Sequence, residues 1–188
     1  MRTLSFTAIA VLATVTLFGC GSASQSMQSA DAGAIPDWFT SIPKDPAVFY
    51  AANTQVSQDL QLAIDKATQG ARTEISRMVE TKITGLQARF TEETGTANNA
   101  QLLDMFTQAN KSVVASSLTG SRVSKQKQMK DGNNWRAYVL VEYPTGAASA
   151  ALAQRIKAND DLYTRFRASQ TFKELDDEVK KYEESKKQ

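Results

Sequence analysis

Residues 135–143, Trp-Arg-Ala-Tyr-Val-Leu-Val-Glu-Tyr, are the stretch of sequence that decides the fold. Its side chains divide into two faces by strict alternation, with Trp, Ala, Val, Val and Tyr on one and Arg, Tyr, Leu and Glu on the other. This period of two, together with the β-branched and aromatic composition, predicts a β-strand. The preceding Asp131-Gly132-Asn133-Asn134 tolerates the positive φ that a tight hairpin turn needs. We therefore predict a hairpin whose first strand is the polar segment from Arg122 to Lys130.

A second apolar run lies far upstream, from Ala47 to Asn53, between flanks rich in turn-forming residues. This pattern predicts another buried strand. Ser57 is then expected to cap a helix, with Asp59 in the first turn, where the helix dipole favours negative charge.

Apolar or small residues recur at steps of three and four from Leu60 to Phe90, which predicts one long helix. Residues 81–90 also alternate as a half-buried strand would, and Gly85 weakens a helix by about 1 kcal/mol. We favour a continuous helix, which Gly95 ends.

The remaining chain favours helices. An apolar stripe predicts a helix over residues 99–118, and a segment rich in alanine predicts another over 146–157, after Pro144 ends the strand. Further helical spacing begins at Leu162, and Thr171 with Glu174 has the spacing of a capping box. The expected fold is therefore α/β of the α+β kind: a small antiparallel sheet of about three strands packed on a long helix and a second helix, with C-terminal helices added.

The single cysteine, Cys20, follows an apolar run that extends from Thr7 to Phe18, with Arg2 ahead of it. About a dozen apolar residues are too few for a membrane span, which needs roughly 20, but they fit a secretory signal. The sequence 17–20, Leu-Phe-Gly-Cys, resembles a bacterial lipoprotein signal, in which the cysteine thiol is acylated and the preceding peptide removed. The alternative is an ordinary signal peptide with an incidental cysteine.

Residue 21 is Gly and not Asp. An Asp there resembles an inner-membrane retention signal in lipoproteins of bacteria with two membranes, so we expect attachment to the outer membrane. Four segments follow: a signal peptide over 1–19, a tether over 20–34 that is rich in small and polar residues, an α/β domain over 35–158 and a C-terminal helical extension over 159–188.

Several short motifs are similar to those of the LPP-twenty family of small bacterial lipoproteins. They are Pro36-Asp37-Trp38, Ile42-Pro43, Phe49-Tyr50-Ala51, the helical Ala67, Ala71-Arg72 and Ile75, and the strand 135–143. Relatives often have Gly where Ala52 stands in this chain. The resemblance covers about residues 36–143 and implies a compact α/β domain in a non-enzymatic outer-membrane protein. Some relatives resemble flagellar or envelope assembly factors.

The chain contains no histidine, which removes the commonest general base and zinc ligand. The acidic pairs at 92–93, 160–161 and 176–177 fit solvated surface charge better than catalytic dyads. We therefore expect no enzyme, no cofactor and no metal. Lysines and arginines, 22 in all, nearly balance 20 acidic residues, so nucleic acid is not an expected partner.

Three features could contact partners. Lys125, Lys127 and Lys130 could touch anionic lipid or polysaccharide, or simply protect a strand edge from aggregation. Trp38 and Phe39 could form a docking site or fix their segment to the core. Phe172 and Leu175 lie in a C-terminal helix that could pair with another chain or pack on its own domain.

The function we expect is that of a lipid-anchored protein with a structural or assembly role in the cell envelope, contacting the membrane and envelope proteins or itself. The alternative is a periplasmic binding module for a small apolar or anionic ligand, held between the long helix and the sheet.

Overall fold

The protein is described by a computed structural model that covers residues 35–187. Three strands form one sheet in the order β1-β3-β2, and both pairs are antiparallel. The strands are β1 (Val48–Ser57), β2 (Arg122–Asp131) and β3 (Asn134–Pro144), and the helices are α1 (Asp37–Thr40), α2 (Leu60–Thr94), α3 (Ala100–Gly120), α4 (Thr145–Lys157), α5 (Asp160–Phe166) and α6 (Gln170–Ser185). The expected α+β fold, with a three-stranded antiparallel sheet, is confirmed.

Strand β3 lies at the centre of the sheet because it is apolar on both faces. Ala137, Val139 and Val141 point into the core beneath the sheet and are fully buried. On the opposite face Tyr138 and Leu140 are buried too, at 5% and 0% exposure. The predicted hairpin is confirmed, with Gly132 at a φ of 60° in the turn between β2 and β3.

The long helix α2 begins at a cap other than the predicted one. Asp59 is the N-cap, and its Oδ1 accepts a hydrogen bond from the backbone N–H of Leu62 at 2.7 Å. Ser57 is instead the last residue of β1, which continues four residues beyond the predicted end at Asn53. An Asp carboxylate caps a helix as well as a Ser hydroxyl does, and the helix begins two residues later than predicted because β1 continues through Ser57.

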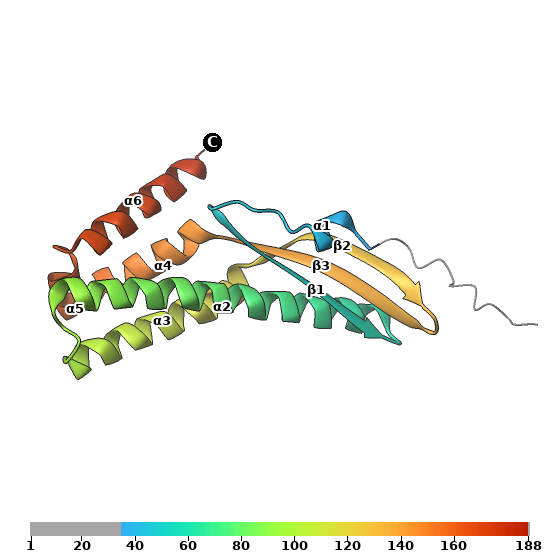
Figure 1. Cartoon of the computed structure of the whole chain (residues 1–188), viewed down its shortest axis with the longest axis horizontal. Coiled ribbons are helices and arrows are strands. Elements are labelled where there is room, and N and C mark those ends of the chain that lie inside the picture. Colours follow the sequence, from blue (N-terminus) through green and yellow to red (C-terminus); the bar gives the residue numbers. More distant parts are fainter. Residues whose placement is uncertain (1–34, 188) are drawn as a thin grey trace, which may run out of the picture.

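Helix α2 runs without interruption through residues 81–90, which confirms the helical alternative for this segment. Gly95 ends it in the left-handed conformation, with φ 65°. At 1.5 Å per residue its 35 residues span about 52 Å, and Figure 1 shows the helix extending along most of the folded part. One stripe is buried along it: Ala63, Ala67, Ala71, Ile75, Val79, Ile83, Leu86 and Phe90.

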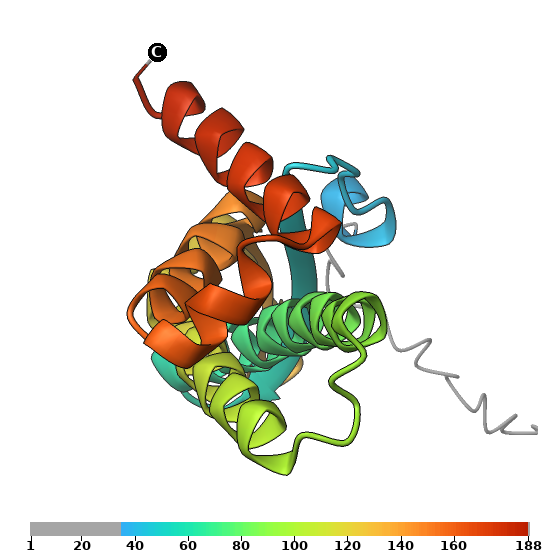
Figure 2. The same cartoon turned by 90° about the vertical axis from the view of Figure 1, so that its left-hand side faces the viewer.

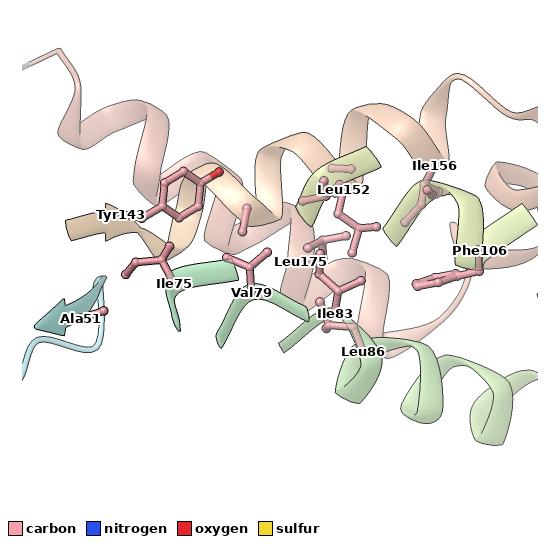
Figure 3. Packing of buried hydrophobic residues seen from close by; sticks show 14 of the residues in the cluster. Ala51, Ile75, Val79, Ile83, Leu86, Phe106, Tyr143, Leu152, Ile156 and Leu175 are labelled. Atoms are coloured by element: carbon pink, nitrogen blue, oxygen red, sulfur yellow. The ribbon is translucent and has the colours of Figure 1, made fainter. Parts of the chain in front are cut away.

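The two ends of α2 have different neighbours. Its first half lies under the sheet, and its second half joins a bundle with α3, α4, α5 and α6 (Figures 1 and 2). Phe90, Phe106 and Phe166 meet in this bundle, with ring centroids 4.1 to 6.1 Å apart. Figure 3 shows the aliphatic residues of α2 and α4, among them Ile83 and Leu152, that connect the bundle to the sheet end.

The C-terminal helices contribute to the same core as the rest of the domain. Leu162 and Phe166 of α5, with Phe172 and Leu175 of α6, belong to the same buried cluster as Val139 of the sheet. The predicted cap at Thr171 is wrong: Ser169 is the N-cap of α6, and its Oγ accepts from the N–H of Phe172. No helix within residues 35–187 is long and apolar enough to cross a membrane.

Candidate functional site: the cationic hairpin

Strands β2 and β3 form a hairpin in which basic side chains collect. Residues 122–136 carry Arg122, Lys125, Lys127, Lys130 and Arg136 against the single acidic Asp131, a net charge of +4. The whole chain carries only +2, so all of its other residues together are net negative, at −2. We call residues 122–136 the cationic hairpin.

Strand β2 is the most exposed regular element of the described chain. Eight of its ten residues are exposed, and the other two, Lys127 and Met129, are half-buried. It pairs only with β3, so it forms an edge of the sheet. A register shift between Val123 and Lys125 marks a β-bulge, a feature common at sheet edges.

Ion pairs hold the two ends of the hairpin in register. Nε of Arg122 donates to Oε1 of Glu142 at 2.6 Å across the β2–β3 pair. At the turn, Nε and Nη2 of Arg136 both donate to Oδ2 of Asp131, at 3.0 and 2.6 Å. Beside it the Lys130 ammonium lies 3.9 Å from the centre of the Trp135 ring. These contacts give a short exposed ribbon a defined shape.

The two lysines in the middle of β2 point away from the core. Lys125 is opposite Leu140 and Lys127 opposite Tyr138, and directly paired residues share a face of the sheet. Tyr138 and Leu140 are on the face that α2 does not cover, because the residues that contact α2 are their neighbours in the alternating pattern. We call this surface the outer face.

Helix α1 covers part of the outer face. The Phe39 ring meets Tyr138 edge-on, with centroids 4.9 Å apart, and Trp38 meets Phe39 in the same manner at 6.3 Å. Both aromatic residues are half-buried, so they fix the N-terminal segment to the sheet and still leave part of each ring exposed. The sequence carried one indication that a further segment covers the outer face. Tyr138 and Leu140 are two large side chains on the face of β3 that does not contact the long helix, so another part of the chain has to bury them.

Phe172 and Leu175, the two C-terminal residues predicted as possible partner contacts, are buried, unlike the half-buried Trp38 and Phe39. Leu175 is 1% exposed and Phe172 is 7% exposed, and Phe172 packs against Tyr163 and Phe166. These two residues therefore pack on their own domain, which was one of the two alternatives for this helix. Cys20 lies outside the described residues.

The acidic pairs are engaged in surface contacts of the helices. Glu93 accepts hydrogen bonds from the backbone N–H and the hydroxyl of Thr171, at 3.2 and 2.6 Å, and these bonds hold the pKa of its carboxyl below the usual value. Asp176 accepts from Lys180 and Lys157, which lowers its pKa too. Asp160 and Asp161 occupy the first turn of α5. Within residues 35–187 no group of three or more acidic, histidine or cysteine side chains is arranged to hold a metal ion.

A shallow hollow of about 340 Å³ opens beside the free edge of β1. The N-terminal segment lines it with residues 43–46, the strand with 48–50, and α2 with Met78. Sequence reasoning did not find this hollow, because it forms where the continuous stretch 43–50 meets Met78 of the following helix. The space directly between α2 and the sheet is filled: Ala63, Ala67 and Ala71 are all 0% exposed.

No model of a known protein family matches the chain, and neither the curated proteins nor the solved structures contain a match to it. The candidate site therefore stands on its own geometry.

Proposed function

We propose that this protein is a lipid-anchored component of the bacterial cell envelope, attached to the outer membrane through Cys20, with a structural or assembly role and no enzymatic activity. The observation that carries the proposal is the sequence around Cys20, a short apolar run that ends in Leu17-Phe18-Gly19 and is followed by small polar residues. Membership of the LPP-twenty family stays a prediction.

The folded domain supports an interaction role. Its core is filled by buried apolar side chains, whereas its excess of positive charge lies on one exposed edge, the cationic hairpin. A domain whose function is to contact other components needs such a surface presented on a stable scaffold. We expect the domain to bind other envelope proteins or a second copy of this chain.

Acylation can be tested directly. Intact mass of the protein isolated from membranes should show a chain that begins at residue 20 and carries acyl groups. Cys20→Ala should abolish that mass shift and release the protein from the outer-membrane fraction. A mature chain of unmodified mass, cut at another position, would contradict the anchor.

Assembly needs a separate measurement. Chemical cross-linking in intact cells should trap species heavier than the monomer, and these should disappear in the Cys20→Ala strain because the domain is no longer held at the membrane. Trapping of the monomer alone, at normal expression of the protein, would show that the assembly role is wrong.

The hollow beside β1 favours the second candidate, a binding module for a small apolar or anionic ligand. Its lining combines Phe49, Tyr50 and Met78 with the charged Lys44 and Asp45. Such a mixture of apolar walls and a few polar groups is typical of ligand sites. Native mass spectrometry of protein purified from its host should then show bound mass, which Met78→Trp should remove by filling the hollow. A spectrum of the chain alone would count against this candidate.

A further inference from the structure

We propose that the cationic hairpin docks on an anionic lipid surface, and that this surface is the membrane that holds the Cys20 anchor. The inference rests on the proposed function and names the partner of its interaction surface. It is carried by the distribution of charge, by the face on which the lysines lie, and by the position at which the described chain begins.

The distribution of charge is the first argument. The net charge is +4 over residues 122–136, and it is still +3 when the count runs to the end of β3 and includes Glu142, the partner of Arg122, which leaves −1 for the rest of the chain. The domain is therefore a dipole with its positive pole on the hairpin, and an anionic surface would turn this pole toward itself. Each lysine or arginine near an anionic lipid surface strengthens binding by about fivefold at physiological salt.

The face on which the lysines lie is the second argument. Lys125 and Lys127 are on the outer face, next to the residues Leu140 and Tyr138. Helix α1 packs on that same face through Phe39, at 4.9 Å from Tyr138. Figure 1 shows α1 lying over the strands, on the side of the sheet opposite α2.

Exposed apolar side chains flank α1 in the sequence. Ile35, just before the helix, is 53% exposed, and Ile42, just after it, is 40% exposed, while Trp38 within it is half-buried. Amphipathic surfaces that combine lysines with exposed apolar and aromatic side chains are suited to the boundary between headgroups and acyl chains. Protection of an exposed strand edge would explain the lysines but not these residues.

The length of chain between the anchor and the domain is the third argument. Fourteen residues lie between Cys20 and Ile35, so Ile35, two residues before α1, can lie at most about 50 Å from the anchored cysteine. The outer face is the part of the domain attached most directly to the anchor. Docking through it would direct the bundle end, at the opposite end of the molecule in Figure 1, away from the hairpin turn and toward partner proteins.

Vesicle sedimentation tests the docking without the lipid anchor. The protein would be a chain that starts at residue 20, carries Cys20→Ser and contains every residue that the structure describes. It should bind vesicles of phosphatidylcholine with 30% phosphatidylglycerol, bind pure phosphatidylcholine vesicles weakly, and be released from the former by 0.5 M salt.

Two variants locate the binding on the hairpin. Lys125→Gln should weaken binding to the anionic vesicles about fivefold, and Lys125→Gln with Lys127→Gln about 25-fold. The control is Lys66→Gln with Lys111→Gln, which removes the same charge from exposed positions of α2 and α3 and should change binding by much less. Melting curves confirm folding, and the single variant remains informative if the half-buried Lys127 is needed for stability.

Three results would overturn the proposal. They are equal binding to the two kinds of vesicle, an equal loss in the control, and a chain that ignores both vesicles but binds an anionic polysaccharide such as dextran sulfate through the same lysines. Because acylation is measured separately by mass, an acylated chain that fails this assay rejects the docking alone, and a chain that binds vesicles but is never acylated rejects the anchor.

The anchored protein provides a second readout. The chain contains two tryptophans, so Trp135→Phe leaves Trp38 as the only indole. In the acylated protein reconstituted into vesicles with brominated lipids, Trp38 fluorescence should be quenched strongly in anionic and weakly in neutral bilayers. Equal quenching in both would show that the anchor, and not the charge, positions the outer face.

Discussion

The first and second halves of α2 belong to one helix but are packed by opposite means. Under the sheet the buried stripe is made of alanines, at positions 63, 67 and 71, and in the bundle it is made of Ile83, Leu86 and Phe90. Small side chains bring a helix close to the strands above it, and large ones fill the wider space among several helices. The sheet end therefore depends on close approach of helix and strands, and the bundle end depends on buried volume.

The two ends should therefore respond to opposite kinds of substitution. Larger side chains should destabilise the sheet end, where helix and strands are in close contact, and smaller side chains should destabilise the bundle end, where they would leave cavities. The free energy of unfolding measures both effects.

Loss of volume in the bundle should have the largest effect. Phe166 is 0% exposed and its ring lies 4.1 Å from that of Phe90, and 5.9 Å from that of Phe106. Phe166→Ala leaves a cavity at the centre of this cluster and should lower the free energy of unfolding by about 3–5 kcal/mol. Urea denaturation measures the change. A loss below 1 kcal/mol would mean that α5 contributes little to the core.

Added volume at the sheet end should cost less but still clearly destabilise. Ala67 is 0% exposed between α2 and the strands. Ala67→Leu should lower the free energy of unfolding by about 1–3 kcal/mol because the helix must move away from β1 and β3. Ala88→Leu, at an exposed position of the same helix, is the control and should stay within about 0.5 kcal/mol. Equal effects at the two positions would contradict close packing at the sheet end.

Two glycines of α2 sharpen the same contrast with a single methyl group. A Cβ at Gly85 would have no atom within 4 Å, whereas a Cβ at Gly70 would lie 2.6 Å from Nδ2 of Asn53 on β1. Gly85→Ala should raise the free energy of unfolding by about 0.5–1 kcal/mol, because alanine favours the helix. Gly70→Ala should lower it, because the Asn53 amide must move.

A second-site variant checks the cause of the Gly70 effect. Asn53→Ala removes the amide that the new methyl group would meet, so Gly70→Ala should be tolerated better in that background than alone. Such coupling between two contacting sites is measured by a double-mutant cycle. Strict additivity would show that Asn53 is not the obstacle.

The sequence was enough to predict the elements whose pattern is local. The alternation at 135–143, the Asp131-Gly132 turn and the long stripe of α2 are each written within one segment, and all three are confirmed. The N-cap residues were harder to predict. Ser57 and Asp59 near the start of α2, like Ser169 and Thr171 near the start of α6, are all residue types that can cap a helix, and only the path of the backbone decides which one does.

The candidate site was only partly predictable for a related reason. The lysines of β2 were visible in the sequence, but their common face with α1 depends on the register between β2 and β3 and on the contact of Phe39 with Tyr138. The bulge between Val123 and Lys125 shifts that register by a residue, so counting along the strand from Arg122 would place the lysines on the wrong face. The position of Phe172 and Leu175 likewise depended on where α5 and α6 fold back.

The smallest effect concerns a polar contact at the far end of α2, where it meets α6. Glu93 accepts two hydrogen bonds from Thr171, and these hold its pKa below the ordinary 4.5. Because the folded pKa is lowered, the contribution of this contact to stability is complete above about pH 4.5 and is lost as the pH falls through the folded pKa. Glu93→Gln should therefore be less stable than the unsubstituted chain at pH 7, and the two should converge in acid.

Melting temperatures across pH 3–7 measure this convergence, and Glu92→Gln, on the exposed side of the same turn, is the control and should remain parallel to the unsubstituted chain. Because Glu93 is at the surface, its contribution is screened by solvent and should be small beside the loss from Phe166→Ala in the same bundle. A gap between the Glu93→Gln and unsubstituted curves that persists unchanged to pH 3 would mean that the glutamine side chain disturbs packing. If the gap closes, the ionised carboxylate itself stabilises the contact between α2 and α6. Polar contacts at the surface then make a small addition to the stability of the bundle end, which comes mainly from its large buried side chains.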